Sequence, residues 1–301
     1  MRLSPYAGAE DLAGMKGLLR ALWRDEGPHV ACLPGDLDWR LNRYPCDPED
    51  HVVVCHDATG LVGFAWRFGV RSEVDLIVGA GATDATNLLI DWSERVEEGA
   101  PPAVIYALET QLSLRRALAA RGYRPTPSAY LHFLQTAADP SPPPRWPAGY
   151  RGASMASLGV PVADRAGLHR AAFASARVSD VNYARVMSAP DYRADLDLVA
   201  VAADGRLAAF VLVWLEVALG VAVCEPVGTH PAHRGRGLAK ALLAEARARA
   251  FALGADTLAV AAFGGDPVTP ELYRAAGFRR VDRSVAYRRS EAGCADGSDP
   301  L

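Results

Sequence analysis

A proline-rich segment near the middle of the chain separates two halves that follow one order of predicted secondary structure. Residues 139–149, DPSPPPRWPAG, hold five prolines in eleven residues. Such a segment is stiff and extended, and it cannot join the interior of a sheet. Because each half of the 301-residue chain is of ordinary domain size, we expect a domain at 1–138, a linker at 139–149, a second domain at 150–290 and a flexible tail at 291–301.

Apolar periodicity and turn residues predict the same elements in both halves. In the second half we expect strands at 150–155, 197–203, 207–217, 220–227, 255–263 and 279–289. The helices of this half are expected at 161–174 and 181–188, from the basic loop to about 253, and at 270–276. In the first half we expect helices at 10–23, at 83–98 and from 113, and strands at 51–57, 61–68, 73–79, 103–109 and 130–136, the last of which completes the copy. Gly122-Tyr123 then corresponds to Gly277-Phe278.

Composition and charge exclude several classes of protein. The net charge is −3, with acidic and basic residues interspersed, which argues against a nucleic-acid partner. The cysteines show no metal-ligand spacing, so we expect no metal site and a reducing, cytoplasmic location. Their positions are 32, 46, 55, 224 and 294.

No basic-then-apolar signal segment opens the sequence. The apolar stretch 207–224 is nearly long enough to span a bilayer, but Asp204-Gly205 precedes it and Gly220 interrupts it. We therefore expect two buried strands there and no membrane partner.

The most informative local pattern is VGTHPAHRGRGLAKALL, in which a strand leads through a basic loop into a helix. Gly235 and Gly237 allow a tight turn and a close approach to a ligand. The helix N-terminus offers unpaired N–H groups and the positive end of its dipole, to which Arg234 and Arg236 add full charges. The loop therefore predicts a site for a pyrophosphate.

Two other phosphate loops do not fit. A Walker A loop needs Ser or Thr after its Lys, whereas Ala241 follows Lys240. A dinucleotide fingerprint needs a third glycine at the position of Lys240.

The pattern Arg-x-x-Gly-x-Ala after Val-x-Thr-His-Pro resembles motif A of the GNAT superfamily of N-acetyltransferases. The order of elements is similar to that of this family in each half. The resemblance therefore implies an α/β (α+β) fold of two GNAT-like domains, each a mixed, mostly antiparallel twisted sheet flanked by helices. It also implies that the loop binds acetyl-CoA as co-substrate. The residues implied in this binding are Val227, Gly228, Thr229, Arg234, Gly235, Arg236, Gly237, Leu238, Ala239, Lys240 and Asp266.

Pro226 lies within the predicted strand and lacks an N–H, so strand pairing must break or bulge there. In the family this strand splays from its neighbour and the pantetheine arm enters as a surrogate strand. The resemblance implies that the backbone from Val227 to Thr229 bonds the pantetheine amides.

Two side chains are candidates for proton transfer. Tyr273 stands four residues before Gly277-Phe278, which resembles the tyrosine that protonates the departing thiolate in the family. Glu225 precedes the expected bulge and is the leading candidate for the base, with Glu216 and His230 in reserve.

The family usually has Asn seven residues before that tyrosine. Here the position is Asp266, which puts one contact to the CoA arm in doubt. A packed aromatic at Tyr273 and a solvated carboxylate at Glu225 are the alternatives. His230 is expected to serve loop structure.

The first half has lost the basic loop. Its equivalent, Val78 to Asp84, keeps small residues but has no arginine, and Asp84 would compete for the helix N–H groups and repel a phosphate. Leu118 stands where the second half has Tyr273. We expect a degenerate domain that binds no CoA and helps to wall the substrate cleft.

The sequence therefore predicts an acyl-CoA-dependent N-acyltransferase that uses acetyl-CoA and acts in a ternary complex. The acceptor would be an amine on a small molecule or peptide, and the protein a monomer or homodimer. One alternative is an acetyltransferase similar to mycothiol synthase, which is also a tandem. Another is a non-catalytic acyl-CoA-binding sensor, which would keep Arg234 to Ala239 and dispense with Tyr273.

Overall fold

The computed structural model describes residues 1–29, 31–43, 48–68, 73–95, 103–140 and 143–289. The expected tail, two residues of the expected linker and the cysteines at 46 and 294 lie outside these residues. The far end of the helix expected at 83–98 lies outside them as well.

All strands of the described residues join one 12-stranded sheet in the order β1-β2-β3-β4-β5-β12-β6-β11-β10-β9-β8-β7. Most neighbours are antiparallel, and β4 with β5 and β10 with β11 are parallel. The strands are β1 (Arg2–Pro5), β2 (Val52–Asp57), β3 (Gly60–Phe68), β4 (Glu73–Val78), β5 (Val104–Leu108), β6 (Tyr123–Thr136), β7 (Tyr150–Ser154), β8 (Asp197–Ala202), β9 (Leu207–Glu216), β10 (Val221–Thr229), β11 (Thr257–Phe263) and β12 (Arg279–Arg289).

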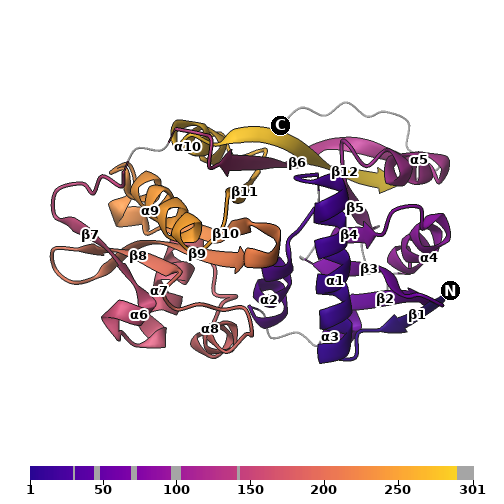
Figure 1. The fold of residues 1–301 in the computed structure, drawn as a ribbon, viewed down its shortest axis with the longest axis horizontal. Coiled ribbons are helices and arrows are strands. Elements are labelled where there is room, and N and C mark those ends of the chain that lie inside the picture. The colour runs from indigo at the N-terminus through magenta and orange to yellow at the C-terminus, as the bar shows by residue number, and fades with distance from the viewer. Residues whose placement is uncertain (30, 44–47, 69–72, 96–102, 141–142, 290–301) are drawn as a thin grey trace.

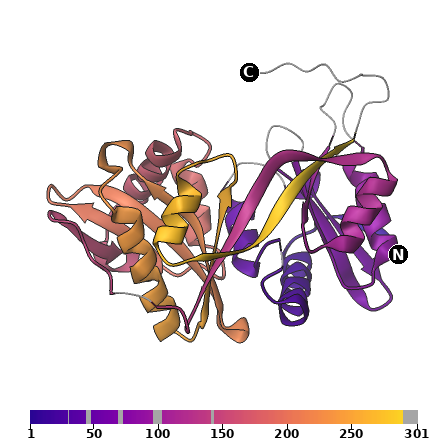
Figure 2. The same cartoon turned by 90° about the horizontal axis from the view of Figure 1, so that it is seen from above.

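The last strand of each half crosses into the other half, which corrects the sequence-based expectation. The strand expected at 130–136 pairs with β11 of the second half instead of completing the first. Strand β12 pairs with β5 of the first half and with β6 along nearly its whole length. With 14 residues, β6 spans about 45 Å at roughly 3.3 Å per residue, which is long enough to serve both halves. Figure 2 shows these two strands bridging the lobes.

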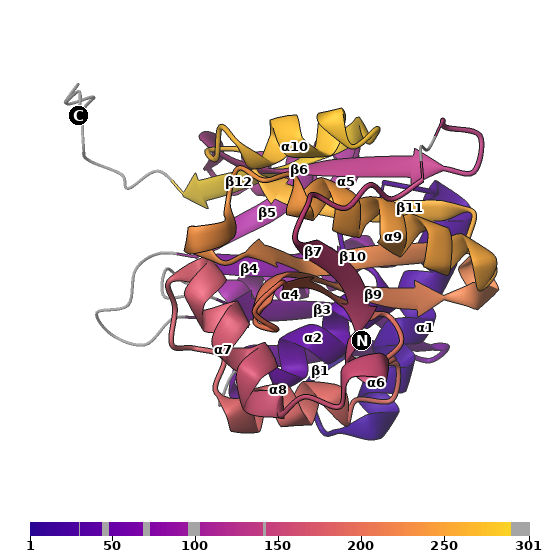
Figure 3. The same cartoon turned by 90° about the vertical axis from the view of Figure 1, so that its left-hand side faces the viewer.

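Helices cover both faces of the sheet (Figure 1). In the second half, α9 and α10 lie on one face and α7 and α8 on the other (Figure 3). The helices are α1 (Ala9–Glu26), α2 (Pro34–Asn42), α3 (Pro48–His51), α4 (Thr83–Ser93), α5 (Leu112–Ala120), α6 (Met155–Leu158), α7 (Val162–Phe173), α8 (Asp180–Met187), α9 (Leu238–Ala252) and α10 (Thr269–Ala275), with short 3-10 turns at Val217–Leu219 and Pro231–His233.

Most predicted elements form within a few residues of their expected ends. The apolar stretch 207–224 supplies β9 and the first part of β10, as expected. Among the described helices, none is both long and apolar enough to cross a membrane. Strand β1 and the helices α2, α3 and α6 were not expected from the sequence.

Helix α2 docks the first half against the second. The helix begins at Pro34 behind a reciprocal cap in which Asp36 accepts from the Leu33 N–H at 2.6 Å. A Cβ on Gly35 would lie 2.2 Å from the Cβ of Trp214 on β9, so only glycine permits this approach. One apolar cluster accordingly contains residues of α1 and α2 together with Trp214 and Tyr183 of the second half.

Ion pairs also join the halves. Lys16 on α1 binds Asp38 at 2.7 Å and Asp191 of the second half at 2.6 Å, and its side chain is only 8% exposed. Arg20 binds Glu216 at 2.7 Å. The two halves therefore meet through a packed and charged interface.

Candidate active site

Strand β10 separates from β11 partway along its length. The two strands pair only over their first residues, the last pair being Val223 with Ala259. On the other edge, β9 stays paired with β10 as far as Thr229, with a register shift around Pro226. The bulge predicted at Pro226 is therefore present. One backbone edge from Glu225 to Thr229 faces no paired strand of the described chain.

The glycine-rich loop ends at this opening and begins α9. Gly235 and Gly237 have φ of 72° and 79°, a region that favours glycine, and each has open space where a side chain would stand. Gly237 is the N-cap of α9, and no described side chain caps the helix. The N–H groups of the first turn are thus available to an anionic ligand.

The cations of this loop differ in their contacts. Arg234 donates to the carbonyl oxygens of Ala172 at 2.7 Å and Thr229 at 3.3 Å, which ties the loop to α7 and β10. Arg236 and Lys240 are exposed beside the helix start. The loop fits a pyrophosphate, since helix N–H groups and exposed cations lie together.

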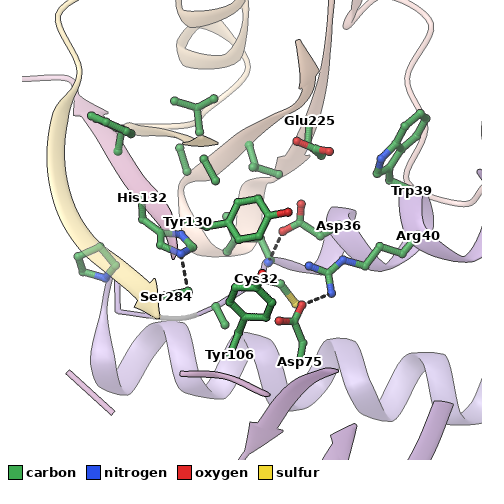
Figure 4. A pocket seen from close by; sticks show the side chains of 18 of the residues that line it. Cys32, Asp36, Trp39, Arg40, Asp75, Tyr106, Tyr130, His132, Glu225 and Ser284 are labelled. Atoms are coloured by element: carbon green, nitrogen blue, oxygen red, sulfur yellow. Dashed lines mark hydrogen bonds and ion pairs between the residues drawn. The ribbon is translucent and has the colours of Figure 1, made fainter. Parts of the chain in front are cut away.

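A cavity of about 190 Å³ lies where the halves meet, on the face of the sheet that carries Glu225 (Figure 4). Its walls come from α1 and α2, from β3, β4 and β5 of the first half, from the shared strands β6 and β12, and from β10 and β11. The polar and charged residues among the described lining are Cys32, Asp36, Trp39, Arg40, Arg43, Asp75, Tyr106, Tyr130, His132, Glu225 and Ser284.

Glu225 is poised between its two protonation states. Burial raises the pKa of its carboxyl to about 7, because the charged form loses hydration, and Asp36 adds to this effect. Arg43, Arg40 and the Trp39 indole oppose it. A carboxyl with this pKa is partly ionised at neutral pH and can accept a proton from a nearby group.

The backbone at Glu225 is held by the docking residue Trp214. The Trp214 indole N–H donates to the carbonyl oxygen of Glu225 at 2.7 Å. Since Gly35 packs directly on the same tryptophan, the first half supports the bulge that presents this carboxyl.

Tyr273 lies on the other face of the sheet, in the apolar cluster that packs under α9. Its side chain is buried, with the ring 5.7 Å from that of Phe133 and 6.0 Å from that of Phe278. Burial raises the pKa of its hydroxyl well above the usual value, with Glu225 adding to the effect. The phenol therefore keeps its proton at neutral pH, as a general acid must.

The remaining candidates make local contacts. The carboxylate of Asp266 accepts from the Val268 N–H at 2.8 Å and from the Thr269 hydroxyl, at the start of α10. His230 accepts from the Ala232 N–H at 3.2 Å, which fits a role in the loop. Glu216 is held by Arg20 and does not line the cavity that Glu225 lines.

The first half has the same opening without the same loop. Strands β4 and β5 also pair only over their first residues, ending at Asp75 with Tyr106. A side chain on Gly79 would meet the Leu18 side chain of α1 at 3.3 Å. Asp84 lies in the first turn of α4, and Leu118 is fully buried on α5. The prediction that this half binds no CoA remains a prediction.

The residues that α2 brings to the cavity were not predicted from the sequence. Asp36, Trp39 and Arg40 all line it, and Arg40 donates to Asp75 at 2.5 Å. The available signal was Leu33-Pro34 followed by Asp36, an N-terminal pattern of a helix. Within the described residues, no group of His, Cys, Asp and Glu is arranged to hold a metal ion.

A model of the Acetyltransferase (GNAT) family matches residues 170–278. No curated protein matches the sequence. Solved structures of similar fold extend over the whole chain. A GCN5-related N-acetyltransferase from Sphaerobacter thermophilus is 20% identical with a TM-score of 0.67, and the match covers 95% of this chain and 94% of that one.

A tandem GNAT protein from the clavulanic acid biosynthesis pathway is 19% identical with a TM-score of 0.62, covering 98% of this chain and 99% of that one. A GNAT acetyltransferase from Colwellia psychrerythraea is 13% identical with a TM-score of 0.60, covering 96% and 100%. At these identities the likeness extends to the fold alone.

Proposed function

We propose that the second half, in which residues 170–278 match a model of the GNAT acetyltransferase family, transfers an acetyl group from acetyl-CoA to an amine. The amine would bind in the cavity between the halves. We place the reaction in the cytoplasm, where thiols stay reduced, and Cys32, Cys55 and Cys224 are free in the structure.

The observation that carries this proposal is the opening between β10 and β11. Its free backbone edge from Glu225 to Thr229 can pair with the amides of a pantetheine arm. The α9 N-terminus with Arg236 and Lys240 stands at one end of this edge, where the pyrophosphate would bind. Bound acetyl-CoA supplies an activated acyl thioester at this place.

Proton transfer would use the two faces of the sheet. Glu225 accepts a proton from the ammonium on the cavity side, which frees the nitrogen lone pair for attack on the acyl carbon. The new C–N bond forms as the C–S bond breaks. Tyr273 donates its proton to the sulfur from the α9 side, and the second proton of the amine restores the phenol. The products are the N-acetyl amine, free CoA and one proton.

The test is a thiol-release assay with acetyl-CoA and a panel of primary amines, with product identified by mass spectrometry. We expect an N-acetyl product that requires both substrates. Direct transfer also predicts no acetylated enzyme when the amine is omitted. Tight binding of acetyl-CoA with no turnover on any amine would instead favour the non-catalytic sensor.

A further inference from the structure

The cavity walls differ in chemistry from one end to the other. At the end formed by the first half and the shared strands, Phe68, Tyr106 and Tyr130 form a continuous aromatic array. The Arg40 guanidinium, paired with Asp75, lies 5.5 Å from the Phe68 ring centroid. Phe68 and Tyr106 stack at 6.1 Å between ring centroids, and Tyr106 and Tyr130 lie 5.4 Å apart. At the other end stands the carboxyl of Glu225. Figure 4 shows the Tyr130 ring between His132 and Asp36, with Glu225 beyond Asp36.

When Glu225 is ionised, the charged groups of the described lining leave one carboxylate in excess. These groups are Asp36, Asp75, Glu225, Arg40 and Arg43. Burial lowers the pKa of His132, which is therefore neutral at pH 7 and adds no charge. Arg40 is paired with Asp75.

The remaining charged groups determine the sign of the net charge at the Glu225 end of the cavity. The Arg43 guanidinium lies 5.7 Å from the Trp39 ring, near Asp36 and Glu225. Arg40 also acts on both carboxylates, so Asp36 and the ionised Glu225 share this end with Arg43 and with a guanidinium already paired to Asp75. A cation restores the balance there, whereas a further carboxylate would oppose it.

The size of the cavity limits the acceptor. An apolar cavity of about 150 Å³ accepts a benzene ring. The present cavity, about 190 Å³, thus has room for one six-membered ring and a short chain. Aromatic walls favour a flat, apolar group, and they also attract an ammonium over their faces.

We propose that the acceptor is a primary ammonium joined by a short chain to a flat ring, with no carboxylate beside the amine. The ring packs against Phe68, Tyr106 and Tyr130, and the ammonium lies against Glu225. This inference rests on the proposed function for the reaction, but the recognition itself depends only on the cavity.

The first experiment compares 2-phenylethylamine with phenylalanine, which differs by one carboxylate. We expect kcat/KM for 2-phenylethylamine to exceed that for phenylalanine by at least about 100-fold, because a buried like charge is strongly disfavoured. Equal rates, or a preference for phenylalanine, would overturn the proposal while leaving acetyl transfer established. If neither amine is acetylated, calorimetry without acetyl-CoA measures whether each amine binds and so still tests the proposed recognition. Selective binding of 2-phenylethylamine would support the recognition without the reaction, and absence of binding would refute it.

A second experiment tests the aromatic wall with Tyr130→Leu and Tyr130→Phe. The readout is the ratio of kcat/KM for 2-phenylethylamine to that for n-hexylamine within each variant, which cancels differences in folding. Leu should lower this ratio about tenfold, as expected for one lost aromatic contact. Phe keeps the ring and should keep the ratio. An unchanged ratio in the Leu variant would show that Tyr130 does not recognise the ring of the acceptor.

Discussion

At the scale of single residues, the protonation state of Glu225 should govern the pH dependence of the reaction. Burial raises its pKa to about 7, against the opposing effects of Arg43, Arg40 and Trp39. A raised carboxyl pKa means that the base form becomes the predominant form only above that pH. We therefore expect kcat/KM to rise through about pH 7 and then level off. The measurement is a pH profile at saturating acetyl-CoA.

Glu225→Gln is the matched variant for this profile. It should lower turnover at neutral pH and lose the inflection near 7. The residual rate should climb toward the pKa of the free amine, about 10 for an alkylamine. A wild-type profile in this variant would assign the inflection to another group.

A substitution at Tyr273 can distinguish a role in proton donation from a role in packing. Its ring is buried against Phe133 and Phe278, and Phe at this position preserves those contacts. If the hydroxyl protonates the thiolate, Tyr273→Phe should lower kcat by roughly 10²–10⁴-fold, the usual contribution of a positioned acid. Acetyl-CoA affinity, measured by calorimetry, should barely change. Full turnover with a genuine acceptor would make Tyr273 a core residue.

At the scale of elements, the start of α9 should supply most of the charge that binds acetyl-CoA. Arg236→Glu should weaken binding by about 10- to 100-fold, since charge-assisted bonds are lost and a like charge is added. Arg236 suits this test better than Arg234, which also bonds the backbone of Ala172 and Thr229.

The control for this test is Arg206→Glu in the turn between β8 and β9, where the side chain is 85% exposed. Affinities by calorimetry should fall only for Arg236→Glu. Equal losses in both variants would indicate a general effect of net charge.

Local patterns in the sequence were enough to predict most elements and the glycine-rich start of α9. Residues such as Asp204-Gly205 mark the turn of a hairpin, and Pro226 lacks the N–H for strand pairing, so both features follow from a few adjacent residues. Adjacent residues do not determine which other strand a strand pairs with. The sequence of β6 gives no sign that it lies beside β11, because pairing across the sheet depends on the whole chain. The cavity walls contributed by α2 were missed for the same reason.

At the scale of the whole molecule, the two halves should differ in cofactor binding. The first half has no arginine in its loop and carries Asp84 in the first turn of α4. Calorimetric titration should therefore give about one acetyl-CoA per chain. In the Arg236→Glu variant the same titration should show no second site of unchanged affinity. Two equivalent sites in the wild type would reverse the assignment of the first half as degenerate.

The halves should not fold as separate proteins. Strand β12 supplies Val285 and Tyr287 to the apolar cluster of the first half, and β6 supplies Phe133 to that of the second. A chain ending before the linker and a chain of 150–289 should each lack cooperative thermal unfolding and expose apolar surface to dye. Co-expression should restore a complex with both segments. A sharp transition in either half alone would contradict this expectation.

The two strands that cross between the halves, β6 and β12, also limit which changes in the gene the fold can tolerate. A domain that binds no ligand of its own, as predicted for the first half, is ordinarily free to be deleted. Here deletion would leave β12 without β5 and β11 without β6, so the surviving half would lose a neighbour at the edge nearest its chemistry. Under the proposed function, point substitutions in the first half should reshape the acceptor cavity, whereas its removal should abolish acetyl transfer. The shared strands would then make the first half the part of the molecule in which acceptor preference can change.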